Sequence, residues 1–274
     1  MFEDQFAYDH KTSFDIREVV QRPKGNALVR EFTYASPFSR RAAYLVSPEI
    51  RPQEPLAAIL YVHWYEPESP DSNRTQFLDE AVQLAGRGVT SLLIETMWSD
   101  RDWFIKRTQA EDQQNTIEQV VELRQAMDIL LAEPGVDPDR FVYVGHDFGA
   151  MYGVLMGSVD PRPSAYVLMA GTPRFSDWYL YYPRLDGEAR QAFIEAFTPF
   201  DPISRVSNLA PAPVLFQFGE DDFHVPVDRG QEFYAASGEP KEANWYHAGH
   251  GLNQQAAIDR VKWLARQLKL TEDQ

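Results

Sequence analysis

FVYVGHDFGA, residues 141–150, is the stretch of sequence that decides the fold. Four residues typical of a buried strand run into Gly145, and Gly149 begins a segment with the pattern of a helix. Glycines on both sides of a polar residue permit a sharp strand-to-helix turn, which leaves that residue strained and exposed above the sheet. The start of the helix favours a carboxylate or a developing oxyanion. We therefore expect Asp147 to be catalytic; the alternative is an Asp that only caps the helix.

Apolar segments alternate with helical segments around this turn, as in a parallel sheet with crossover helices. Eight strands are predicted, over residues 27–35, 41–46, 56–63, 90–96, 140–145, 165–170, 213–219 and 243–247. Helices are predicted over residues 71–87, 111–132, 148–159, 228–236 and 254–268. We expect an N-terminal arm over residues 1–25 and a short lid insertion over residues 174–204. Because no linker is visible, we predict a single α/β domain over residues 1–274, with a mostly parallel eight-stranded sheet and helices on both faces.

The turn at residues 145–149 resembles the nucleophile elbow of the α/β-hydrolase superfamily. Asp147 stands where commoner members carry Ser or Cys, and this resembles the Asp-nucleophile branch of epoxide hydrolases and haloalkane dehalogenases. At a later strand end, Asp222 matches the position of the family's acid, with Asp221 as the runner-up one residue out of register. His250, between two glycines after the last strand, matches the general base. The order of the three residues is that of nucleophile, acid and histidine in the superfamily.

A second loop at a strand end, HWYEP at residues 63–67, resembles the His-Gly-x-Pro loop of the same superfamily. Trp64 replaces the usual glycine, and one extra residue precedes the proline. The resemblance implies an oxyanion hole formed by the N–H of Trp64 or Tyr65 together with the N–H of Phe148. The alternative is that His63 and Trp64 only pack against the strand tops.

The predicted insertion stands where capped members of the superfamily carry a lid that acts on the leaving group. It begins with RFSDWYLYYP, residues 174–183, and its candidate substrate-binding residues are Trp178, Tyr179, Tyr181 and Tyr182. A tyrosine hydroxyl can protonate an opening epoxide, and an indole N–H can bind a halide. Simple aromatic packing is the alternative for all four. His63 and Trp98, from two other loops, are also predicted to line the substrate pocket.

An Asp nucleophile favours attack on a saturated carbon. Attack on an ester would form a mixed anhydride, whereas displacement of an epoxide oxygen or a halide gives an alkyl ester of Asp147. Water deprotonated by His250, which Asp222 orients, then hydrolyses that ester. We therefore expect an epoxide hydrolase. The alternatives are a haloalkane dehalogenase, a non-catalytic binding protein, or an ester or lactone hydrolase that resembles the dienelactone-hydrolase branch, with Asp147 as general base.

Composition narrows the class of protein. The 274 residues are 44% hydrophobic, which is enough for a buried core, and the longest apolar run is far too short for a membrane span. The net charge of −15 disfavours nucleic acid and anionic membranes as partners and leaves a small-molecule substrate. The lack of cysteine and of a visible signal peptide favours a cytoplasmic location. No metal or cofactor is expected, because neither a zinc motif nor a dinucleotide-binding fingerprint is present.

Overall fold

The computed structural model describes residues 1–11 and 13–271, so residue 12 of the predicted arm and residues 272–274 of the predicted domain lie outside the description. A nine-stranded sheet has the order β1-β2-β3-β5-β4-β6-β7-β8-β9. Its strands are β1 (Arg17–Lys24), β2 (Ala27–Ala35), β3 (Arg40–Pro48), β4 (Leu56–Val62), β5 (Val89–Ile94), β6 (Val136–His146), β7 (Ala165–Met169), β8 (Val214–Gly219) and β9 (Lys241–Tyr246). Strands β4 to β9 are parallel to one another, and β1, β2 and β3 pair antiparallel at one edge.

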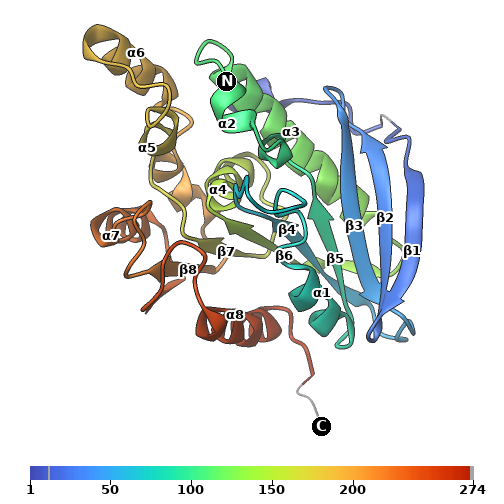
Figure 1. Cartoon of the computed structure of the whole chain (residues 1–274). Helices are drawn as coiled ribbons and strands as arrows, with labels where there is room; N and C mark the ends of the chain where they lie inside the picture. Colours follow the sequence, from blue (N-terminus) through green and yellow to red (C-terminus); the bar gives the residue numbers. More distant parts are fainter. Residues whose placement is uncertain (12, 272–274) are drawn as a thin grey trace.

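Helices cover both faces of the sheet, as Figure 1 shows. One apolar cluster packs α1 (Leu78–Ala85) and α8 (Gln254–Gln267) on one face, and a second packs α3 (Asp112–Leu131), α4 (Phe148–Val159) and α7 (Val227–Ala236) on the other. All seven residues of β4 are buried, as expected for a central parallel strand covered on both sides. No helix in the described parts of the chain is both long and apolar enough to cross a membrane.

The predicted mostly parallel α/β architecture is confirmed, but the predicted number of strands is wrong by one. Residues 17–24, which we expected within the arm, form β1 and pair antiparallel with β2. All eight residues of β1 are exposed. An edge strand without a buried face has no hydrophobic alternation, so the pattern that revealed the other strands gives no signal here.

Two connecting regions lead to the candidate site. The helix predicted over residues 71–87 begins only at Leu78, because the Asp71 carboxylate accepts the N–H groups of Asn73 and Thr75 and holds the preceding residues in turns. The remaining short elements are α2 (Trp103–Lys106), α5 (Phe175–Tyr179), α6 (Gly187–Phe197), η1 (Glu3–Phe6), η2 (Met97–Ser99), η3 (Pro202–Ser204) and η4 (Val206–Leu209). The insertion at residues 174–204 thus contains α5, α6 and η3, and α6 lies at the periphery of the molecule in Figure 1.

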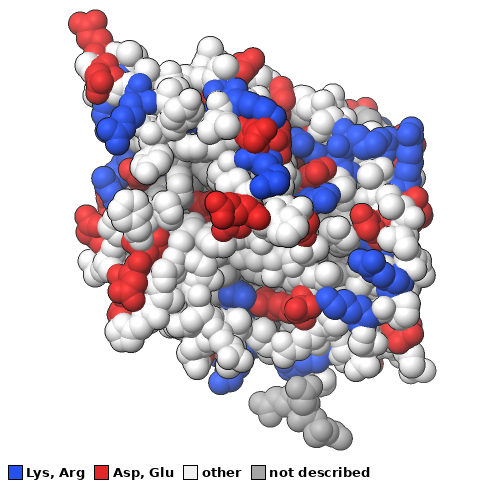
Figure 2. Space-filling view, in the orientation of Figure 1, with Lys and Arg blue, Asp and Glu red and all other residues white. Residues whose placement is uncertain are grey.

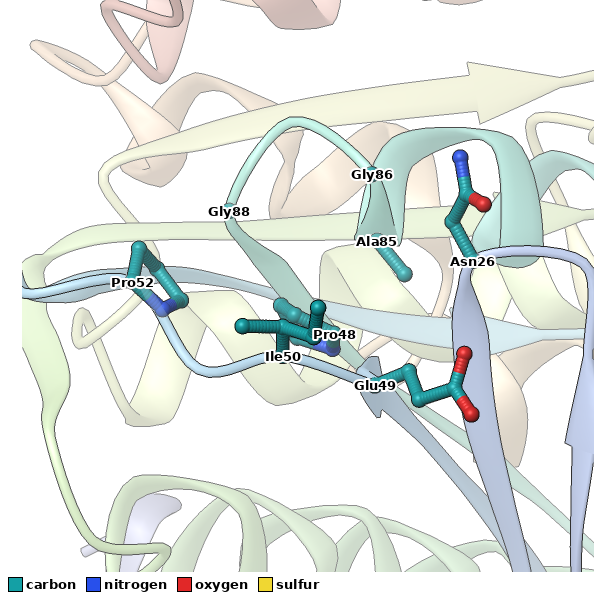
Figure 3. Close-up of a pocket in the computed structure, with 8 residues that line it drawn as sticks. All are labelled: Asn26, Pro48, Glu49, Ile50, Pro52, Ala85, Gly86 and Gly88. Atoms are coloured by element: carbon teal, nitrogen blue, oxygen red, sulfur yellow. The ribbon is translucent and has the colours of Figure 1, made fainter.

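The two edges of the parallel sheet carry different chemistry. A hollow at the amino-terminal edge is shown in Figure 3 and is lined by Asn26, Pro48, Glu49, Ile50, Pro52, Ala85, Gly86 and Gly88. These residues include no histidine or hydroxyl nucleophile. The predicted catalytic residues follow the carboxyl ends of β6, β8 and β9, at the opposite edge. Figure 2 shows acidic and basic side chains interspersed over the face seen in Figure 1, so the net charge of −15 does not come from one patch there.

Candidate active site

Asp147 occupies the turn between β6 and α4. Its φ of 55° and ψ of −116° are rare for a residue other than glycine and cost about 1–3 kcal/mol. The flanking glycines make this turn possible: a Cβ on Gly145 would lie 2.3 Å from the carbonyl oxygen of Gly149, and a Cβ on Gly149 would lie 2.2 Å from that of Val62. The strained elbow predicted from the sequence is therefore present, and the close approach of three backbone segments explains its two glycines.

The expected exposure of Asp147 is wrong, because the residue is only 1% exposed. The loops that carry Tyr65 and His250 lie against its carboxylate. The Tyr65 N–H donates to Oδ2 of Asp147 at 3.4 Å, and Nε2 of His250 lies 3.9 Å from Oδ1. The elbow thus aims its side chain at two other loops of the carboxyl edge, which shield it from solvent.

His250 stands between the two aspartates. Its Nδ1 lies 2.8 Å from Oδ2 of Asp222. On the other side of the ring, neither His250 Nε2 nor Asp147 Oδ1 has a hydrogen-bond partner among the described residues. The distance of 3.9 Å between these two atoms allows strong attraction but exceeds a hydrogen bond. The structure therefore brings together all three residues of the predicted order, with the histidine in the middle.

Asp222 is held as an ionised acceptor. Its Oδ1 accepts the N–H groups of His224 at 2.8 Å and Val225 at 3.0 Å. Burial favours its neutral form, but the hydrogen bond to His250 and those to the backbone hold the pKa of Asp222 below its ordinary value. Asp221, the runner-up, is exposed. Asp222 rather than Asp221 is therefore the carboxylate that orients His250.

The two carboxylates also set the charge of His250. Burial lowers the pKa of this imidazole, but its attraction to Asp147 and Asp222 outweighs burial and raises the pKa to about 9. The ring therefore carries a proton on both nitrogens at neutral pH, of which Nδ1–H donates to Asp222. The side chains of Asp147 and His250 consequently stand side by side at the elbow.

The predicted oxyanion hole is corrected in one residue. The N–H of Trp64 donates to Oε1 of Gln76 at 3.1 Å, so Trp64 is not a backbone donor to the site. Tyr65 supplies the N–H of this loop that faces Asp147. Phe148 is the first residue of α4, where backbone N–H groups have no acceptor within the helix. Tyr65 thus donates to the carboxylate, and Phe148 follows it at the start of α4.

His63 and Trp98, which we expected to line the substrate pocket, are buried side chains. They are 2% and 0% exposed, respectively. Nδ1 of His63 donates to the carbonyl of Trp64 at 2.7 Å, its Nε2 accepts from the Ser99 hydroxyl at 2.9 Å, and the Trp98 indole donates to the carbonyl of His63 at 3.0 Å. Burial lowers the pKa of His63 to about 4, so the ring is neutral. Both residues shape the loop at residues 63–67, which is the packing alternative.

The three tyrosines of the predicted lid differ in burial and in their contacts. Tyr179 is fully buried, and its hydroxyl lies 2.6 Å from that of Tyr152. Tyr181 and Tyr182 are 57% and 50% exposed. Within the described chain, none of the three predicted tyrosine hydroxyls makes a hydrogen bond to Asp147. The hydroxyl of Tyr179 is therefore paired with that of Tyr152, whereas Tyr181 and Tyr182 are exposed side chains.

Trp178 is the lid residue that reaches the site. Its ring stacks on His224 at a centroid distance of 5.0 Å and lies 5.5 Å from Phe148 and 5.9 Å from His250. Its indole nitrogen is buried and has no hydrogen-bond partner among the described residues. Trp178 thus packs beside His250, with an indole N–H that no described residue binds.

Two residues of the site were not predicted. Gln76 Nε2 lies 2.5 Å from Nδ1 of His146, and Nε2 of His146 lies 2.9 Å from the backbone oxygen of His250. His146 stands beside Asp147 in the elbow, which is a usable signal, whereas no sequence pattern marks Gln76. In residues 1–11 and 13–271, no three His, Cys, Asp or Glu side chains are grouped as metal ligands.

Comparison with solved structures identifies the fold. No family model matches the chain. Among solved structures, it is similar to the acetyl xylan esterase from Paenibacillus sp. R4, with a TM-score of 0.76 and 17% identity over 97% of this chain and 90% of that one. It is also similar to acetyl xylan esterase 1 from Thermoanaerobacterium sp. JW/SL YS485, with a TM-score of 0.73 and 13% identity over 97% and 92% of the two chains. The chain has the α/β-hydrolase fold.

Two further likenesses refine the comparison. The chain is also similar to a protein assigned as a dienelactone hydrolase from Klebsiella pneumoniae. That match has a TM-score of 0.64 and 18% identity, over 89% of this chain and 98% of that one. This supports the resemblance in proportions to the dienelactone-hydrolase branch. A polyketide transferase of Stachybotrys chlorohalonatus is 30% identical over 97 residues. That match spans 35% of this chain and 31% of the transferase, about a third of the length of the relative.

Proposed function

We propose that this chain is a hydrolase of carboxylic esters or lactones, in which Asp147 and His250 activate water. One observation carries the proposal: the carboxylate of Asp147 and the imidazole of His250 face each other at 3.9 Å, and Asp222 holds the far nitrogen of the ring. Esterases and a dienelactone hydrolase among the similar structures support an ester or lactone substrate. The pairing of the Tyr179 hydroxyl with Tyr152 and the exposure of Tyr181 and Tyr182 support it too.

The first step of the proposed reaction uses Asp147 as general base. Its carboxylate takes a proton from water while the water oxygen adds to the carbonyl carbon of the substrate. The negative charge that develops on the carbonyl oxygen is stabilised by the N–H of Phe148 and by the N-terminus of α4. No anhydride forms, because Asp147 makes no bond to carbon.

The second step uses His250 as general acid. The tetrahedral intermediate breaks its bond to the alcohol oxygen, and Nε2 of His250 donates its proton to that oxygen. The products are a carboxylic acid and an alcohol, or one hydroxy acid from a lactone. The proton held by Asp147 then passes to the neutral imidazole, 3.9 Å away, which restores the starting state.

An alkyl-enzyme route is the second candidate, and one contact favours it. The N–H of Tyr65 donates to Oδ2 of Asp147. If water attacked an ester formed through Oδ1, the negative charge would develop on Oδ2, where this N–H would stabilise it. In that route Oδ1 displaces an epoxide oxygen or a halide, and Trp178 is the available N–H donor for the halide. Loss of the Asp147 charge would also lower the pKa of His250 and make it a base for the second step.

A four-class substrate panel tests the proposal: a short p-nitrophenyl ester, a γ-lactone, a terminal epoxide and a primary haloalkane. We expect turnover of the ester or the lactone, and a loss of about 10²–10⁴-fold in kcat in Asp147→Asn. The exposed neighbour provides the control, since Asp221→Asn should keep the wild-type rate. Turnover of the epoxide or haloalkane alone would favour the second candidate. Turnover of none of the four, or a fully active Asp147→Asn, would overturn the proposal.

A further inference from the structure

Trp64, Gln76 and His146, which take no part in the proposed steps, connect the loop at residues 63–67 to the loop of His250. The N–H of Trp64 donates to Oε1 of Gln76 at 3.1 Å, and Nε2 of Gln76 lies 2.5 Å from Nδ1 of His146. Nε2 of His146 lies 2.9 Å from the backbone oxygen of His250. A continuous path of hydrogen bonds therefore runs from the loop at residues 63–67 to the residue that carries the acid.

The partners determine the tautomer of His146. Because Oε1 of Gln76 accepts from Trp64, the amide NH₂ group of Gln76 faces Nδ1 of His146, which must accept. The proton is therefore on Nε2, which donates to the carbonyl of His250. Burial, with a smaller contribution from the nearby charge of His250, lowers the pKa of His146 well below its ordinary value, so the ring stays neutral. Each ring nitrogen is satisfied in this one arrangement.

The indole of Trp64 completes the arrangement by packing against both imidazoles. Its ring stacks on His146 at 4.8 Å with the planes 10° apart, and on His250 at 5.1 Å with the planes 25° apart. A Cβ on Gly251 would lie 3.3 Å from the same indole, so the loop of His250 packs directly on it. A protonated imidazole on the face of Trp gains cation–π attraction. This contact explains a large aromatic residue where the resembled loop has glycine.

We propose that Trp64, Gln76 and His146 are a positioning unit, which holds the backbone and the ring plane of His250 so that its Nε2 faces Asp147. The inference rests on the proposed function. Asp222 fixes one atom of the ring, Nδ1, and a ring held at one atom can still swing. The stacked indole fixes the plane of the ring, and the hydrogen bond from His146 fixes the carbonyl of the same residue. The three residues act through His250 and do not touch the substrate.

Two matched pairs of variants test the unit in the full chain. Trp64→Leu and His146→Leu remove the stacked ring and the donor, whereas Trp64→Phe keeps an aromatic face and His146→Gln keeps an Nε2 donor. The readouts are the downfield proton resonance of the Nδ1–H of His250, which Asp222 binds, together with kcat and KM. We expect the Leu variants to lose the resonance and about tenfold in kcat with KM within twofold. The Phe and Gln variants should keep the resonance and most of kcat.

The outcomes separate a positioning role from packing. Leu variants that keep the resonance and kcat, or Phe and Gln variants that lose as much as the Leu variants, would overturn the unit. If a Leu variant does not fold, Gln76→Met removes both hydrogen bonds at a partly exposed position and should give the same two losses.

The resonance needs no substrate, so the inference and the proposed function fail in different ways. A lost resonance in the Leu variants, together with a fully active Asp147→Asn, would support the unit and overturn the function. An inactive Asp147→Asn beside Leu variants that match the wild type would support the function and overturn the unit.

Discussion

The elbow at residues 145–149 and the segment at residues 174–204 both contact His250, through Asp147 and Trp178, yet different contacts fix their side chains. At the elbow, a Cβ on Gly149 would lie 2.2 Å from a backbone oxygen, so only glycine fits there. The glycines in the sequence therefore predict where Asp147 lies. In the lid, Tyr179 is placed by side-chain packing. Its ring contacts Phe175 and Phe197, and Arg107 donates to its backbone oxygen. A steric requirement for glycine can be recognised in a sequence. Which of several neighbouring aromatic residues faces the site cannot be recognised in the same way.

The largest effect is expected at Asp222, the carboxylate that holds His250 beside the elbow. Asp222→Asn should lower kcat by about 10²–10⁴-fold, because the amide no longer orients or charges His250. Asp221→Asn alters the adjacent carboxylate, which is exposed, and should leave kcat unchanged. Steady-state kinetics on the same ester or lactone measures both. Equal losses in the two variants would show that charge near the loop matters and that the 2.8 Å bond to His250 does not.

The charge of His250 gives an intermediate effect. Its pKa is raised from the ordinary 6.5 to about 9, so the folded protein keeps the acid form at neutral pH and loses it as pH rises through 9, and the stability it contributes is complete below pH 6.5. We expect kcat to fall about tenfold per unit above pH 9, and the ion pairing of His250 to stabilise the fold only below that range. The groups that face the ring are Asp147, Asp222, His146 and His224. A kcat that instead rises through pH 9 would indicate that neutral His250 acts as base.

The smallest effect is expected in the lid. Tyr179→Phe removes a buried hydrogen bond to Tyr152 and should lower the free energy of unfolding by about 1 kcal/mol, with kcat within twofold. Tyr181→Phe, at a 57% exposed position, should change neither. Urea unfolding and kinetics check both variants. A large loss of kcat in either variant would indicate that the tyrosine takes part in catalysis, which would contradict the difference between the elbow and residues 174–204.

The same difference between predictable and unpredictable features holds for other parts of the molecule. The parallel strands, the elbow and the pairing of Asp222 with His250 were predictable, because buried strands are apolar and strand ends of a parallel sheet meet at one edge. The exposed strand β1 was not predictable from burial, since no residue in it is buried. The side-chain bonds of Gln76 join segments far apart in the chain and follow no local pattern. The burial of Asp147 depends on two distant loops, which the elbow pattern does not describe.

A single turnover in oxygen-18 water tests the role of Asp147 most directly. The measurement is the mass of the product and of the peptide that contains residue 147, with enzyme in excess over an ester or lactone that the chain hydrolyses. If Asp147 is the general base, the label appears in the product carboxylate and the mass of the peptide is unchanged. Label in the Asp147 carboxylate would contradict this account, because oxygen enters that group only when water attacks a covalent ester of the enzyme.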